Sequence, residues 1–185
     1  RNQIMGMSER DKLITSLRMD VFIRWVVLGI GLLLVLAFYL HGKVQNIFPI
    51  LAAASFVIVY NLAYSIMLDR RIVFPVMDYL DIFCDIVSIT VVAHFTGGSA
   101  SIFYWFYLFG IIAEGFHFNY RGVYFVLILS IICFGGILFI EAGGVVSAEF
   151  ILQAVERLGL ILLLGIVTLF YTRKAIEKEK QLEES

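Results

Sequence analysis

Six long apolar runs, separated by short polar segments, follow one another along the chain. Apolar character within each run is continuous and does not alternate with polar residues, which favours helices over the strands of a barrel. A hydrocarbon core of about 30 Å needs roughly 20 apolar residues per helix. The runs are Val21–Leu40, Phe48–Leu68, Val76–Phe95, Ile102–Phe118, Val123–Ile140 and Ile151–Thr172. The pattern therefore predicts an all-α polytopic membrane protein with six transmembrane helices. The fourth run is the shortest and carries Glu114, so a re-entrant segment is the alternative there.

Lysines and arginines gather in alternate polar segments. The basic residues of these segments are Arg1, Arg10, Lys12, Arg18, Arg70, Arg71, Arg121, Arg173, Lys174, Lys178 and Lys180. The intervening connections, residues 41–47, 96–101 and 141–150, contain a single basic residue, Lys43. Basic segments stay on the cytoplasmic side of a membrane. We therefore expect both termini in the cytoplasm and a multi-pass location in the membrane.

Three regions follow from this topology. Residues 1–20 form a cytoplasmic juxtamembrane segment, residues 21–172 a six-helix transmembrane domain, and residues 173–185 the start of a cytoplasmic helix. The last region is rich in helix formers and has Glu and Lys at helical spacing, so it extends the sixth helix out of the membrane. The three outward connections are too short for a folded domain. A stimulus must therefore enter the bilayer, reach its surface or come from another membrane protein.

Composition and charge narrow the class of protein. Hydrophobic residues make up 61% of the 185 residues and charged residues 16%, which suits a chain surrounded by lipid. The net charge of −1, with no basic patch, gives no sign of nucleic-acid binding. Cys84 and Cys133 lie in separate apolar runs. They are typical of packing residues and not of a disulfide or a zinc site.

Three aspartates share one face of the third helix: Asp78, Asp81 and Asp85 stand at positions i, i+3 and i+7. A carboxylate near the centre of a bilayer costs about 2.5–3.5 kcal/mol on insertion scales. These groups must therefore face the bundle, pair with donors or be partly protonated. Either they hydrogen-bond to neighbouring helices, with Asp78 close to the arginines of the second connection, or they form a face that senses a proton, an ion or a ligand.

The fourth helix adds a second polar pair at the same depth. Glu114 and His117 stand at i, i+3, a spacing found in bundle-type metal sites. A plain interhelical hydrogen-bond network is the preferred interpretation, and no metal is predicted. His94 is expected to be a structural histidine, with a pH-sensing role open. Glu156 and Arg157 are expected to anchor the sixth helix at the interface or to pair with other helices.

The connection between the third and fourth helices is the most distinctive segment. Gly97 and Gly98 permit a tight turn. An aromatic cluster follows at the outer membrane edge: Phe103, Trp105, Phe106 and Tyr107. It forms either an interfacial aromatic belt or a shallow cleft for a flat lipophilic molecule such as a quinone.

Two stretches within this six-helix layout carry a resemblance. They are Asp81-Ile-Phe-Cys-Asp-Ile and His94-Phe-Thr-Gly-Gly-Ser-Ala-Ser-Ile-Phe103. Together with the layout they resemble the six-helix membrane sensor domain of bacterial sensor histidine kinases of the redox-responding and pilus-regulating type. The resemblance implies a homodimer in a bacterial cytoplasmic (inner) membrane, a response regulator reached through a kinase core, and quinone contact at Gly97, Gly98 and Phe103. The sequence departs from the family at Ile102, where the family usually has proline.

No phosphoacceptor histidine motif or glycine-rich nucleotide loop lies within these 185 residues, so no catalytic residue is predicted. Any kinase activity would belong to a further C-terminal part. Two other classes of function remain open. One is the input domain of a cyclic-dinucleotide synthase, and the other is a small membrane subunit of a respiratory or photosynthetic complex or of a transporter.

Overall fold

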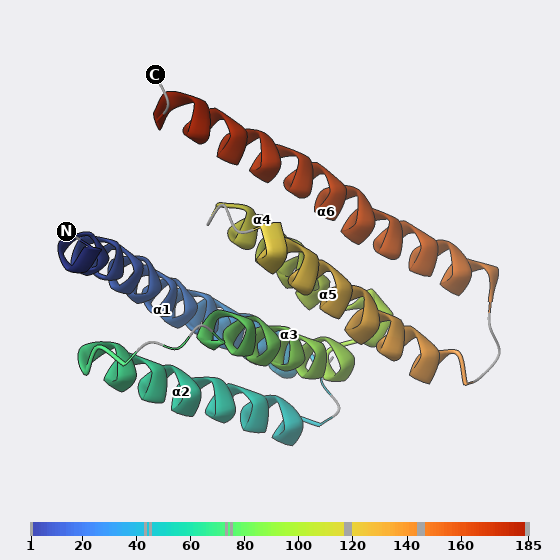
Figure 1. Cartoon of the computed structure of the whole chain (residues 1–185). Coiled ribbons are helices and arrows are strands. Elements are labelled where there is room, and N and C mark those ends of the chain that lie inside the picture. The colour runs from blue at the N-terminus through green and yellow to red at the C-terminus, as the bar shows by residue number, and fades with distance from the viewer. Residues whose placement is uncertain are drawn as a thin grey trace. The chain divides into compact units, whose positions relative to one another are not determined.

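The computed structural model describes residues 2–42, 44, 46–72, 74, 76–116, 120–143 and 147–183, with the backbone alone for residues 2–13, 16, 78, 179, 180 and 183. All regular structure in these ranges is helical (Figure 1). The α-helices are α1 (Asn2–Leu40), α2 (Phe48–Asp69), α3 (Met77–Phe95), α4 (Trp105–Phe116), α5 (Tyr120–Glu141) and α6 (Ala148–Glu183). Two short 3₁₀ helices, η1 (Gly98–Ala100) and η2 (Ile102–Tyr104), join α3 to α4. The predicted all-α class is confirmed.

Within the described residues, four helical segments are long and apolar enough to cross a membrane. They are Leu17–Leu40 of α1, Phe48–Asp69, Tyr120–Glu141 and Ala148–Lys178 of α6. The two remaining predicted spans differ for separate reasons. Helix α3 has 19 residues but includes three aspartates, and the apolar helix Ile102–Phe116 is short. The structure thus supports a membrane protein, whereas the count of six spans stays a prediction.

Residues 1–77 form one compact unit, in which α1 and α2 run antiparallel (Figure 1). Arg18 and Asp69 make an ion pair of 2.8 Å between the two helices. Next to it lies an apolar cluster of Leu17, Val21, Tyr64, Leu68 and Met77. The segment predicted as a juxtamembrane region, residues 1–20, is helical from Asn2 onward and continues into the first apolar run without a break.

The ends of α2 follow from local sequence. Pro49 lies in its first turn, where a missing N–H leaves no helical hydrogen bond unmade. At the other end the N–H of Ile72 donates to the carbonyl of Met67, and the N–H of Arg71 donates to the carbonyl of Leu68. This is a Schellman motif, with Arg71 at φ 55° in the position where glycine is usual.

Residues 78–185 form the second compact unit, in which α4, α5 and α6 pack against one another in pairs. Single glycines permit close approach. Gly115 of α4 lies against Thr168 of α6, and Gly165 of α6 lies against Leu127 of α5. The largest fully buried side chains of this unit are Ile86, Tyr107, Ile111, Val123, Val126, Phe134 and Ile161. The core is therefore built at the crossings of these three helices, with α3 contributing Ile86.

Helix α6 is the longest element of the second unit, with 36 residues. It continues from the apolar span into the charged tail and ends at Glu183. The predicted continuation of the sixth helix into the charged tail is confirmed, whereas its exit from the membrane stays a prediction. At 1.5 Å per residue this helix is about 54 Å long, well beyond the hydrocarbon thickness of about 30 Å.

Candidate functional site

The turn between α3 and α4 is closed by backbone geometry that glycine favours. Gly97 has a φ of 129° and Gly98 a φ of 57°, both in the left-handed region. The hydroxyls of Thr96 and Ser101 lie 2.7 Å apart, and the Ser101 hydroxyl accepts the N–H of Phe103 at 3.2 Å. Thr96 and Ser101 are both buried. The tight turn predicted from the paired glycines is confirmed.

Glu141, at the end of α5, holds this turn. Its two carboxylate oxygens accept the backbone N–H of Ser99 at 2.9 and 3.1 Å. The carboxylate also fills the space beside Gly98, so that a Cβ atom at this glycine would overlap with it. Gly98 is therefore required twice, for its positive φ and for the approach of the carboxylate. The sequence singled out Gly98 but gave Glu141 no role.

Arg157 ties the same turn to α6. Its guanidinium Nη1 donates to the carbonyl oxygen of Ser101 at 3.1 Å and lies over the ring of Tyr104, 4.9 Å from the ring centre. In return the Tyr104 hydroxyl donates to the backbone carbonyl of Arg157 at 2.7 Å. Pairing of Arg157 with another helix, one of its two predicted roles, is thus observed. We call the residues that make these contacts the turn cluster: Ser99, Ser101, Tyr104, Glu141 and Arg157.

The aromatic residues that follow the turn do not form one exposed patch. Tyr107 is fully buried, and Phe103 is only 4% exposed and stacks on Phe106 at 5.7 Å between ring centres. Trp105 and Phe109 are exposed. Of the predicted ligand contacts, Gly98 and Phe103 are buried within the protein, and only Gly97 is exposed. A lipophilic molecule at this end would meet Gly97, Ile102 and Trp105 on the surface before it met Phe103.

Helix α3 carries its polar residues on a protected face. Asp81 is 6% exposed, Asp85 is partly buried, and Ser88, one turn further on, is buried. The expectation that these carboxylates turn away from lipid is therefore met at Asp81. Asp78 begins the same helix, and its side chain lies outside the described residues. Two residues beyond Ser88, the Thr90 hydroxyl accepts a hydrogen bond from the Tyr107 hydroxyl at 2.8 Å and links α3 to α4.

The second predicted polar pair is only partly described. Glu114 lies in the last turn of α4 and is partly buried, whereas His117 lies outside the described residues. Within the described ranges no three side chains of metal-ligating type gather at one place. Cys84 and Cys133 are both free thiols and partly buried. His94, in the last turn of α3, contacts Phe95 edge to face.

Comparisons with known protein families, with curated proteins and with solved structures found no match to this chain. The functional argument therefore depends on the residues themselves. The turn cluster joins the end of α5, the α3–α4 turn and α6 through hydrogen bonds of its side chains. It is the candidate functional site.

Proposed function

We propose that this chain is the membrane-embedded sensory input region of a signalling protein, with six transmembrane helices and both termini in the cytoplasm. A stimulus in or at the membrane would change the packing around the α3–α4 turn, and α6 would carry the change to a cytoplasmic output domain. The output domain we favour is a histidine kinase core that acts on a response regulator, in a homodimer. The basis for the kinase is the sequence motif from Asp81 to Phe103.

The observation that supports this function most is the attachment of the α3–α4 turn to α6. Arg157 lies near the beginning of α6 and contacts Ser101 and Tyr104. From there the helix continues without a break to Glu183. Near the other end of the bundle the Thr172 hydroxyl donates to the carbonyl of Gly115 in α4, at 3.3 Å. Shifts of about 1–2 Å in a packed helix are enough to switch an attached domain.

A lipophilic stimulus is the class that best suits this arrangement. Gly97, Ile102 and Trp105 are exposed at the turn, and no outward connection is long enough for a separate ligand-binding domain. A quinone is one such molecule, and it would bind at the edge of the turn cluster. The buried Asp81 and partly buried Asp85 would then bias the packing of α3 by their protonation or hydrogen bonding.

The test uses membranes that contain the product of the complete reading frame. We expect phosphate transfer from labelled ATP to this protein, and an altered rate of transfer when Arg157 is replaced by Gln. Glu156→Gln, an exposed neighbour on α6, is the matched control and should leave the rate unchanged. Formation of a cyclic dinucleotide in place of phosphotransfer would overturn the kinase and keep the sensory role. Neither activity, or equal rates in all three proteins, would refute the proposed signal route.

A further inference from the structure

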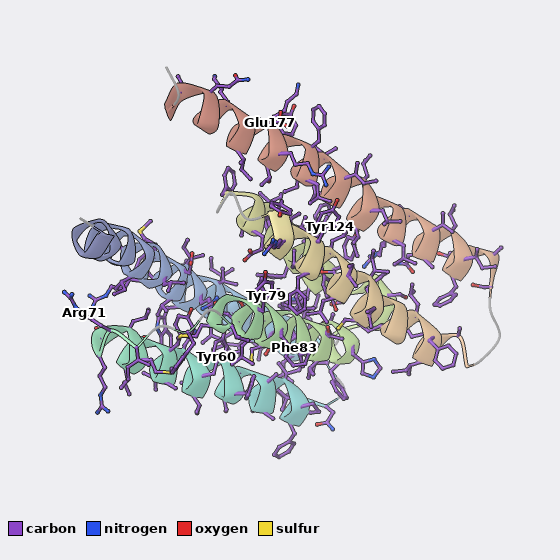
Figure 2. All side chains as sticks on the ribbon, viewed as in Figure 1. Tyr60, Arg71, Tyr79, Phe83, Tyr124 and Glu177 are labelled. Carbon is purple, nitrogen blue, oxygen red and sulfur yellow. The ribbon has the colours of Figure 1, made fainter. Side chains whose placement is uncertain are left out.

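Two arginines, one at the beginning of α5 and one on the charged part of α6, each contact a tyrosine of α5. The guanidinium of Arg173 donates to the hydroxyl of Tyr124 at 2.9 Å and lies 6.0 Å from the centre of its ring. Tyr124 is labelled on α5 in Figure 2. Arg121 donates to the hydroxyl of Tyr120 at 3.3 Å and lies 5.8 Å from that ring centre. Tyr120 and Tyr124 are four residues apart on α5 and share one face. The two guanidiniums are therefore held by tyrosines that lie about one helical turn apart on α5.

Two lysines follow Arg173 along α6. Lys174 lies over the ring of Phe170, 4.7 Å from its centre, and Lys178 is exposed one turn later. Among the described residues, no carboxylate lies within 4.0 Å of a nitrogen of Arg121, Arg173 or Lys174. We call these four basic residues the basic face: Arg121, Arg173, Lys174 and Lys178. Aromatic rings hold the cations of Arg121, Arg173 and Lys174 in place, and no carboxylate of the described residues pairs with these three.

The surface next to the basic face is apolar. Ile128 of α5 follows Tyr124 by one turn and is 55% exposed. On α6, Phe170 and Ile166 precede Arg173 and are similarly exposed. These three kinds of surface match the three parts of a phospholipid. The cations match the phosphate, the tyrosines beside them the glycerol region, and the exposed apolar strip that leads into the span an acyl chain. A soluble phosphate or an acidic peptide would use the charges but not the strip.

We propose that the basic face binds the phosphate of an anionic phospholipid, whose acyl chain lies along the apolar strip of α5 and α6. A single phosphate with three acceptor oxygens can bridge the two guanidiniums, which donate hydrogen bonds in a planar fork. Because Arg121 belongs to α5 and Arg173 to α6, the bound lipid would hold the exit of α6 against α5. This inference does not depend on the kind of output domain attached.

The test measures lipids retained by the purified intact chain in detergent, by native mass spectrometry and by titration with phosphatidylglycerol. We expect phosphatidylglycerol to bind more tightly than phosphatidylcholine. Arg121→Gln and Arg173→Gln should each weaken phosphatidylglycerol binding about fivefold. Arg70→Gln, which removes an equally exposed arginine at the end of α2, is the matched control and should leave it unchanged.

Three outcomes would overturn the proposal. One is equal affinity for the two lipids, the second is a loss in Arg70→Gln as large as in Arg173→Gln, and the third is full competition by inorganic phosphate at the same concentration as the lipid. Thermal unfolding without added lipid shows whether each variant is folded. Should a glutamine variant fail to fold, Arg173→Lys keeps the charge and loses the fork, and we expect it to bind about two- to threefold more weakly.

Discussion

At the scale of single residues, Gly98 has the least freedom to change. It combines a φ of 57° with the Glu141 carboxylate in the space where a Cβ would lie. We expect Gly98→Ala to lower the free energy of unfolding by about 2 kcal/mol, because a non-glycine residue in the left-handed region and a displaced carboxylate both cost energy. Denaturant titration of the intact chain in detergent, followed by tryptophan fluorescence, measures this loss.

Gly136 provides the matched control for this substitution. It is exposed in the middle of α5, has no atom within 4 Å of an added Cβ and lies in regular helix. Gly136→Ala should therefore leave stability unchanged or raise it by about 0.5–1 kcal/mol. A Gly98→Ala protein as stable as the Gly136→Ala protein would contradict the role given to the turn.

Glu141 can be tested by its coupling to Gly98. Glu141→Ala leaves the buried N–H of Ser99 without its acceptor, which we expect to cost about 1–3 kcal/mol. Because the same substitution removes the overlap at Gly98, the double variant should lose less stability than the sum of the two single losses. Glu149→Ala, at an exposed position in the first turn of α6, is the control and should lose only the helix-dipole contribution of about 0.3–1 kcal/mol. Strict additivity of the Gly98 and Glu141 substitutions would show that the carboxylate does not lie against this glycine.

At the scale of elements, the crossing of α4 and α6 depends on two small side chains. A Cβ at Gly115 would overlap with the γ-methyl group of Thr168. We expect Gly115→Ala to destabilise the protein by about 1–3 kcal/mol through overpacking, and Thr168→Ser to restore much of the loss by removing that methyl group. Gly159→Ala, on an open part of α6, is the control. The same denaturant titration measures all four proteins, and failure of Thr168→Ser to rescue would place the strain elsewhere.

The helices could be predicted from the sequence because long apolar runs and charged ends are local features. Both the all-α class and the continuation of α6 into the charged tail followed from them. The turn cluster could not be predicted as a unit. Ser99 and Glu141 are 42 residues apart, and Ser101 and Arg157 are 56 apart, so nothing local pairs them. The glycine pair signalled a turn, whereas the charges that hold it come from two other helices.

The aromatic residues after the turn were predicted to lie together, and the structure separates them. Four aromatic residues in close succession suggested one exposed cluster, yet a helix turns each of them to a different side. Tyr107 is fully buried and donates to Thr90, while Trp105 is exposed. The amino-acid composition of the segment does not show which of its rings are buried and which are exposed. The positions at which α3 and α5 cover the helix decide which rings are buried.

At the scale of the whole molecule, the number of membrane crossings distinguishes two arrangements of the helices. In the part of the chain that the structure describes, four helices are long and apolar enough to span a membrane. If α3 and α4 also cross, the α3–α4 turn lies outside the cell; if they form a re-entrant hairpin, it does not. Both arrangements keep α1, α2, α5 and α6 in the same orientation. The turn is therefore the one connection that separates six spans from four.

Cysteine labelling of the intact chain measures this directly. In a Cys84→Ala, Cys133→Ala background, single cysteines are placed at exposed positions and treated with a membrane-impermeant maleimide before and after cell lysis. The positions are Asn46, Ala100 and Gly143, expected outside, and Arg70 and Lys178, expected inside. We expect Ala100→Cys to react in intact cells as readily as Asn46→Cys, because a full crossing of α3 exposes the turn. Reaction of Ala100→Cys only after lysis, with the other four positions as expected, would instead mean four spans. In that case a stimulus at the outer surface could reach the turn cluster only through the Glu141 end of α5 and the beginning of α6.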